Sequence, residues 1–208
     1  MPLNIYTINH PLVRIWTSYL CNNNMQISEK EMMETIHKIG MILVYESTRK
    51  SLNANNFYIK KLEEMIEVNL FPQQSFYSFI SDMYLSQILS KDISYLVPNS
   101  KVYTIHPYLK NNKWVVSQDY NSIPQNLINH QNVVIMEQYL VTGKLLAIID
   151  LLLHRHASIK NIRICCILCS TETFKAIGSR YPGLNIYTTK IIDDNSNQNM
   201  KSFCYTHY

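Results

Sequence analysis

The turn at residues 137–145, EQYLVTGKL, carries the groups that could bind a phosphate. It follows the apolar stretch NVVIM (132–136) and leads into the apolar run LLAIIDLLL, an order typical of a buried strand followed by a long helix. Unpaired backbone N–H groups and the helix dipole favour anions at such a helix N-terminus. Glu137, Thr142 and Gly143 would supply an acid, a hydroxyl and a close backbone approach.

The same turn also has an ordinary interpretation. A phosphate cradle usually contains several glycines, because Cβ atoms keep the ligand away from the backbone. Here Gly143 is followed by the bulky Lys144 and Leu145, and the whole chain has only 4 glycines in 208 residues. The alternative is a strand-to-helix turn in which Thr142 caps the helix. Spacing alone leaves both interpretations open.

Apolar stretches on either side of this turn predict the sheet that must position it. The predicted strands are SFYSFI (75–80), KVYTIH (101–106), NVVIM (132–136), NIRICCIL (161–168) and NIYTTKI (185–191). Helical segments between them favour a βαβ order, and therefore a parallel sheet covered by helices in one α/β domain over residues 1–208. Ligands of such sheets bind at the carboxyl ends of the strands. The polar, turn-rich excursion at 107–131 is the expected place for a protruding arm.

Helix signals are clearest in the first half of the chain. Ser28 and Glu31 have the spacing of a capping box, and an apolar stripe at helical spacing follows: Met32, Ile36, Ile39, Leu43 and Val44. Further helices are predicted over MYLSQILSKDISYL (83–96) and from about Thr171.

Composition limits the class of protein. With 47% hydrophobic and 16% charged residues, the chain can bury a full core. The net charge of +4 comes without a long basic run, so we expect no nucleic-acid partner. The amino end lacks the pattern of a signal or transit peptide, and the longest apolar run is too short to span a bilayer. Five cysteines, three of them in the apolar CCILC (165–169), suit reduced thiols in a core.

Several landmarks together resemble the uracil phosphoribosyltransferase family over nearly the whole chain. They are HPLV (10–13), IGMILVYESTR (39–49), VPNSKVYTIHPY (97–108), TGKLLAIIDLL (142–152), NIRICCIL, YPGL (181–184) and NIYTTKI. The resemblance implies a type I phosphoribosyltransferase fold. It also implies a parent reaction of pyrimidine salvage, in which uracil and phosphoribosyl pyrophosphate (PRPP) give UMP and pyrophosphate.

The chain departs from this family where the chemistry would occur. The family's PRPP loop reads Asp-Pro-x-x-Ala-Thr-Gly-Gly-Ser, and residues 137–145 retain only Thr142 and Gly143 of it. The resemblance gives Glu137 the role of the acid that bridges the ribose hydroxyls. Lys144 replaces a glycine and Leu145 replaces a serine.

Other family groups are replaced as well. Two arginines that would face pyrophosphate fall at Tyr84 and Leu109, and each bidentate arginine contact contributes about 1.5 to 3 kcal/mol. Where the family has a Pro-Gly-Leu-Gly-Asp-Ala-Gly-Asp loop for uracil, this chain reads IIDDNSNQNMKSFCYTHY. Asp193 and Asp194 in this stretch are more typical of a solvated surface than of a base-recognition site.

Three other constellations have ordinary interpretations. The cluster His154, Arg155 and His156 is expected in the last turn of a helix, where cations complement the dipole. The cysteines of CCILC are expected in the core, since adjacent strand residues face opposite ways and cannot share a zinc ion. Glu46 and Arg49 are expected to form a surface helix pair. No metal site is predicted.

Three hypotheses of different classes follow. The first is a catalytically inactive family member that acts as a structural or regulatory partner. The second is an enzyme with residual phosphoribosyl transfer that depends on Glu137, Thr142 and Gly143, and the third is a nucleotide sensor without turnover. No cofactor is required, and Mg²⁺ would enter only with PRPP.

The resemblance and the amino-acid usage give expectations for the partners and the location of the protein. A homo-oligomer is expected, with the 107–131 excursion and HPLVRIW, including Trp16, as contact candidates, and an unidentified protein partner is the alternative. No nucleic acid or membrane partner is expected. Heavy use of Asn, Ile, Lys and Tyr suggests an AT-rich genome, which fits the plastid stroma as well as a bacterial cytoplasm.

Overall fold

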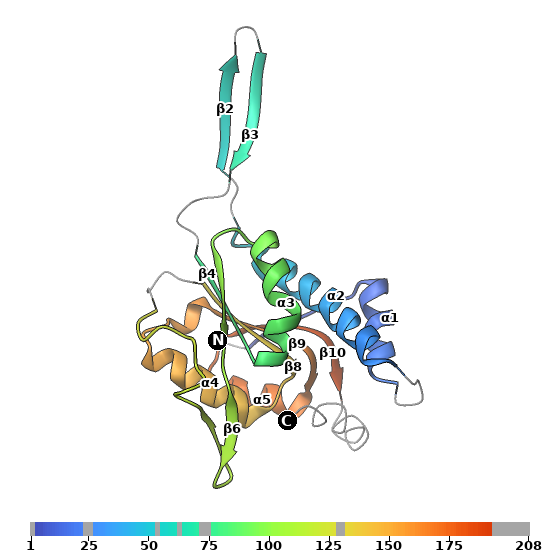
Figure 1. Cartoon of the computed structure of the whole chain (residues 1–208), viewed down its shortest axis with the longest axis vertical. Coiled ribbons are helices and arrows are strands. Elements are labelled where there is room, and N and C mark those ends of the chain that lie inside the picture. Colours follow the sequence, from blue (N-terminus) through green and yellow to red (C-terminus); the bar gives the residue numbers. More distant parts are fainter. Residues whose placement is uncertain are drawn as a thin grey trace.

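Six parallel strands form the central sheet, in the order β1-β10-β9-β8-β4-β5. The structure is a computed structural model that describes residues 3–22, 27–52, 55–61, 64–70, 76–127 and 132–192. Figure 1 shows the sheet with helices on both sides. The strands are β1 (Asn4–Thr7), β4 (Tyr77–Ser81), β5 (Ser100–Thr104), β8 (Asn132–Tyr139), β9 (Ile162–Ser170) and β10 (Asn185–Ile192). The predicted parallel α/β fold is confirmed.

All five predicted strands are present, with ends that differ by a few residues. The predicted first strand began at Ser75, which lies outside the described residues. The sixth strand, β1, was not predicted. It is the edge strand beside β10, and its four side chains are all exposed, so it carries no alternation of buried and exposed residues.

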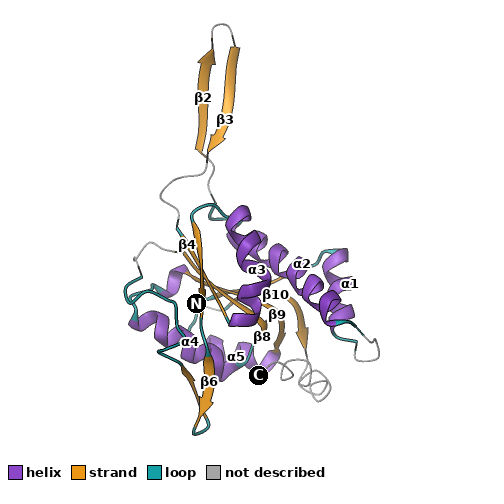
Figure 2. Ribbon diagram, in the orientation of Figure 1, coloured by secondary structure: helices purple, strands orange, loops and turns teal. Residues whose placement is uncertain are grey.

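Helices cover both faces of the sheet (Figure 2), in two groups that pack into different cores. The first group is α1 (Pro11–Leu20), α2 (Glu29–Thr48) and α3 (Met83–Leu96); the second is α4 (Thr142–His154) and α5 (Thr171–Arg180). A short 3-10 helix, Ile159–Asn161, precedes β9. None of the described helices has the length and apolar character needed to cross a membrane.

Alternation along the central strands builds two separate cores. In β8, Ile135 packs into the core under α4 and α5, while the next residue, Met136, packs into the core under α2 and α3. Cys165 and Cys166 in β9 divide in the same way, and Cys169 shares the core of Cys166. All three thiols are free and buried, which confirms the expected core role.

The first long helix forms as its sequence predicts. Ser28 caps α2, its hydroxyl accepts from the Glu31 N–H, and the Glu31 carboxylate accepts from the Ser28 N–H at 3.0 Å. Gly40 lets α2 approach α3 closely, because an added Cβ would lie 2.8 Å from Leu89 Cδ2. This glycine belongs to the IGMILVYESTR landmark.

Two hairpins lie outside the sheet, and one of them falls within the excursion predicted to form the arm. The hairpin of β6 (Pro107–Lys110) and β7 (Lys113–Val116) turns through Asn111 and Asn112, both at positive φ, and packs against α4. This hairpin contacts α4 on one side, and its exposed tip extends from the body in Figure 1. A second and longer projection in Figure 1 is the hairpin of β2 (Asn55–Lys61) and β3 (Glu64–Leu70), for which no strand was predicted.

The strand order places a topological switch point between β4 and β8. From β4 the chain moves outward to β5 on one side, and it returns to β8 on the other side. Ligands of open parallel sheets bind in the crevice at the carboxyl ends of the two strands at such a point. A ligand of this sheet is therefore expected at the ends of β4 and β8.

Candidate functional site at the β4–β8 switch point

Two acidic residues lie at the switch point, one on each strand. Asp82 directly follows β4 and caps α3, its Oδ1 accepting from the Leu85 N–H at 2.9 Å. Glu137 lies near the carboxyl end of β8 and is 5% exposed. The sequence predicted Glu137 as a site residue but gave Asp82 no role.

Lys144 lies between these two carboxylates. Its Nζ is 2.7 Å from Glu137 Oε2 and 3.5 Å from Asp82 Oδ2, and its side chain is 3% exposed. Lys144 belongs to the first turn of α4, where the helix dipole disfavours a cation, so the two carboxylates must compensate it. The buried Lys144 ammonium therefore offsets the charge of the two carboxylates at the switch point and does not face solvent.

The buried Glu137 carboxyl has an unusual proton affinity. Burial raises its pKa to about 7, against the lowering influence of the Lys144 ammonium, and Asp82 adds a smaller rise. Its Oε1 atom accepts no hydrogen bond from the described residues. A carboxyl of this kind titrates near neutral pH.

Gly143 is covered by an aromatic ring. A Cβ added at Gly143 would lie 2.5 Å from Trp114 Cδ1 and 3.2 Å from Trp114 Nε1. Trp114 belongs to β7, which packs along α4. The absence of a side chain at Gly143 therefore admits the indole of Trp114, and this ring occupies the approach to the loop backbone. The sequence gave no role to Trp114.

Thr142 does not cap α4, so the capping role in the ordinary-turn interpretation was wrong. The N-cap is Val141, which makes no side-chain cap bond, and Thr142 is the first helical residue. The Thr142 hydroxyl donates to Thr173 Oγ1 at 3.1 Å, toward the start of α5. Leu145, at the position of the family's serine, is buried in the core under α4.

The positions of the two replaced arginines carry no positive charge. Tyr84 lies in the first turn of α3, where burial and the carboxylates of Glu29 and Asp82 raise its pKa. Leu109 lies on β6 and is 56% exposed. Asp193 and Asp194 lie outside the described residues.

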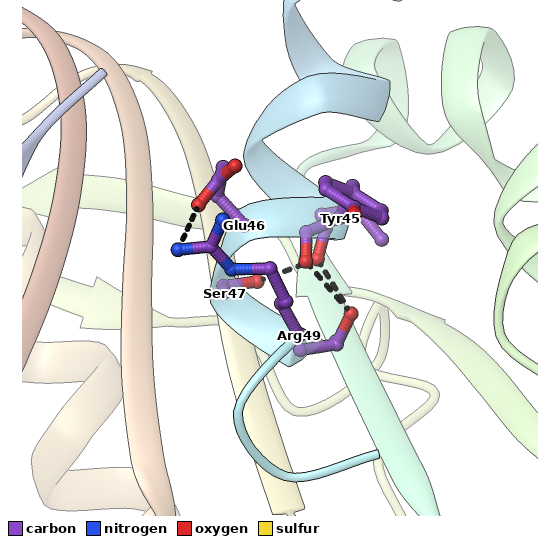
Figure 3. Close-up of polar contacts among 6 residues, drawn as sticks. Tyr45, Glu46, Ser47 and Arg49 are labelled. Atoms are coloured by element: carbon purple, nitrogen blue, oxygen red, sulfur yellow. Dashed lines mark hydrogen bonds and ion pairs between the residues drawn. The ribbon is translucent and has the colours of Figure 1, made fainter. Parts of the chain in front are cut away.

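The remaining constellations take ordinary structural roles, although Arg155 and His156 were expected in the last turn of α4 and lie just beyond it. Figure 3 shows the ion pair of Glu46 with Arg49 at the end of α2, where Nη2 and Oε2 are 3.3 Å apart. His154 ends α4, and the Arg155 guanidinium donates to the carbonyls of Ile123 and Pro124. In the described part of the chain, no cluster of His, Cys, Asp or Glu side chains could hold a metal ion.

A six-stranded parallel sheet, covered by helices on both faces and with a strand–turn–helix loop at its switch point, defines an open α/β protein. The family model for uracil phosphoribosyltransferase matches residues 7–202. The chain therefore belongs to the uracil phosphoribosyltransferase family.

The relatives are distant but match along most of this chain. The chloroplastic uracil phosphoribosyltransferase of Arabidopsis thaliana is 23% identical over 195 residues, which cover 93% of this chain and 65% of that protein. The uracil phosphoribosyltransferase homolog of Porphyra purpurea is 24% identical over 199 residues, covering 94% and 93%. The solved structure of the AQ2163 protein from Aquifex aeolicus has a TM-score of 0.72 at 19% identity, covering 91% of this chain and 88% of that one.

Proposed function

We propose that this member of the uracil phosphoribosyltransferase family has kept the fold, does not transfer phosphoribosyl groups, and acts as a structural or regulatory partner. The observation that carries the proposal is the contact of Lys144 with Glu137 and Asp82 at the switch point. In the resemblance, Glu137 is the acid that bridges ribose hydroxyls. Here that acid is buried and already paired.

The other retained loop residues are also engaged within the protein. Thr142 bonds to Thr173, and Gly143 is covered by Trp114. A substrate phosphate would have to displace the indole and would meet Leu145 turned into the core. Loss of one preorganised donor commonly costs about 3 to 4 kcal/mol of transition-state stabilisation, so the combined losses leave no physiological rate.

The donor set does not suit Mg²⁺ with PRPP. A divalent cation prefers several free oxygen ligands, whereas the carboxylates of Glu137 and Asp82 already face the Lys144 ammonium. A second cation there would be repelled. We therefore assign no step to a metal ion.

The proposal is tested by incubating the purified protein with labelled uracil, PRPP and Mg²⁺ and measuring UMP. We expect no UMP above a heat-denatured control. We also expect no heat of PRPP binding at 1 mM ligand, which excludes a binding free energy of about −4 kcal/mol or stronger. UMP production would overturn the proposal. Binding without UMP would replace it with the sensor hypothesis.

A matched pair of variants identifies the site of any activity that is found. Thr142 opens α4 and Thr171 opens α5, and both are partly buried. Thr142→Ala should abolish an activity that uses the loop, whereas Thr171→Ala should preserve it. Equal effects would place the activity elsewhere or in a contaminant.

Self-association is proposed as the partner relation, and the β2–β3 hairpin supports it. A two-stranded hairpin is marginally stable alone in water, and this one stands away from the body with Met65 71% and Ile66 43% exposed. A second copy of the chain would cover these side chains. The opening helix adds exposed Leu12 and Ile15, while Trp16 packs partly into the body.

Light scattering tests self-association. We expect a mass at least twice the 24.4 kDa of one chain, and a shift toward the monomer in Met65→Lys. Met83→Lys, which changes an equally apolar exposed residue on α3, serves as the control. A monomer mass at high protein concentration would contradict the proposal.

A plastid location is the last part of the proposal. It is supported by the chloroplastic name of the Arabidopsis relative and by homologs in the red algae Porphyra purpurea and Pyropia yezoensis. Immunolocalisation in the source cell tests this location. We expect the signal in the stroma, and a signal in the cytoplasm would contradict the proposal.

A further inference from the structure

A cavity lies at the carboxyl ends of β4 and β5, on the far side of β4 from the loop at residues 137–145. Its volume is about 520 Å³, within the range of small-molecule pockets. It is lined by Met83, the segment 104–106 and the segment 119–122. None of the loop residues 137–145 is among its lining residues.

The outer wall of this cavity is fixed in place by hydrogen bonds. The Ser117 N–H donates to the His106 carbonyl at 3.0 Å, and the Ser122 N–H donates to the Thr104 carbonyl at 3.0 Å. The Ser122 hydroxyl also accepts from the Thr104 N–H at 2.7 Å. Asp119 and Tyr120 thus lie on a short segment that is held at both ends against the chain following β5.

The wall presents aromatic rings and one carboxylate. The ring of His106 is stacked on Tyr108, with centroids 6.2 Å apart, and meets Tyr120 edge-on at 6.1 Å. Within the described residues, the Asp119 carboxylate makes no hydrogen bond or ion pair. Tyr120 is 68% exposed, so its ring can still lose exposure against a ligand.

The charge of the lining selects the ligand class. The described lining residues include the carboxylate of Asp119 but no lysine or arginine, so the charged side chains of the lining disfavour a phosphate or carboxylate ligand. Aromatic faces beside a carboxylate attract organic cations through cation–π contacts and an ion pair. Met83 and Ile105 add apolar contact surface.

We propose that this cavity binds a small organic cation that carries an aromatic ring, with its ammonium at Asp119 and its ring against Tyr120 and His106. The site is separate from the loop at 137–145. The proposal of a cation site does not depend on whether the chain transfers phosphoribosyl groups.

The test is an amide-resonance NMR titration of the full chain with benzylamine. Benzyl alcohol and benzoate serve as probes of the same size that are neutral and anionic. We expect benzylamine to shift the resonances of Met83, His106 and residues 119–122, with a millimolar Kd. Benzyl alcohol should bind about fivefold more weakly, because the ion pair is lost, and benzoate should bind more weakly still.

Two variants and a control locate the contacts. Asp119→Asn should weaken benzylamine about fivefold and remove its advantage over benzyl alcohol, and Tyr120→Ala should weaken both probes. Glu34→Gln removes the same charge from the exposed surface of α2 and should change neither affinity. Both cavity residues are exposed, so the spectra should keep the dispersion of the folded protein.

The proposal is overturned by any of three results. These are equal affinity for the three probes, shifts confined to other parts of the chain, and an Asp119→Asn affinity equal to that of the unmodified protein.

Discussion

Lys144 and Glu137 face each other across the strand-to-helix turn, with Nζ 2.7 Å from Oε2 and with 3% and 4% of their side chains exposed. Asp82 approaches the same ammonium at 3.5 Å. The loop at residues 137–145 therefore pairs its Lys144 ammonium with carboxylates of the protein and does not offer it to an anionic ligand. The contact joins β8, α4 and the cap of α3, and it gives the switch point a structural role.

Removal of the ammonium should destabilise the protein strongly. Lys144→Met leaves two buried carboxylates without their shared cation, and we expect a loss of about 3 to 5 kcal/mol in the free energy of unfolding. Urea unfolding followed by circular dichroism measures it. Lys91→Met, at an exposed position on α3, should change stability by less than about 0.5 kcal/mol. Equal stability of the two variants would show that the buried pair is dispensable.

Stability should depend on pH through Glu137. Its pKa is raised from 4.5 to about 7 in the folded chain, so the folded state holds this proton to a higher pH than the unfolded chain. The contribution of Glu137 to stability is therefore largest below pH 4.5, falls as pH rises to about 7, and is constant above that. The stability difference between the unmodified protein and Glu137→Gln should fall by up to about 3 kcal/mol across this window. A constant or rising difference would refute the assignment.

An added methyl group at Gly143 should displace Trp114. Gly143→Ala places a Cβ at 2.5 Å from Cδ1 of a rigid ring, so the β6–β7 hairpin must shift, at a cost of about 1 to 3 kcal/mol. Tryptophan fluorescence in a Trp16→Phe background reports the ring directly. In a Trp114→Ala background the same substitution should cost much less, and additive effects would contradict the contact.

A charge in the central strand should prevent folding. Ile135 is fully buried between β4 and β9, and an unpaired carboxylate there costs several kcal/mol, comparable with the total stability. We expect Ile135→Asp to be insoluble on expression. Ile15→Asp, at a residue that is 62% exposed on α1, should remain soluble and melt cooperatively. A soluble, cooperatively melting Ile135→Asp protein would show that β8 is not central.

The sequence was sufficient to predict the elements that depend on interactions between residues close in the chain. The capping box of Ser28 and Glu31 formed as its spacing requires, and the helix at 83–96 has the predicted limits. The central strands were also predictable, because burial on both faces requires the continuous apolar runs seen in β8 and β9. The parallel order followed from helices that alternate with these strands.

Elements that depend on distant partners escaped prediction. The β2–β3 hairpin does not lie in the sheet, so no core-facing pattern marks it, and the exposed β1 is defined by its pairing with β10. Thr142 has the residue type of a cap, yet its hydroxyl turns to Thr173, a residue of the next helix.

The sequence by itself determined five of the six sheet strands, the helices α2 to α5 and the position of the strand-to-helix loop, because apolar periodicity and local capping set these features. The family followed from the resemblance of several sequence landmarks. Only the tertiary structure decided what the loop does with its side chains. The direction of the Lys144 ammonium depends on Asp82, which lies 62 residues earlier and reaches the site only because β4 and β8 are neighbours. The cover over Gly143 depends in the same way on β7 packing against α4. Electrostatic compensation and close packing act between atoms that the fold brings together, and the spacing along the chain does not contain those distances.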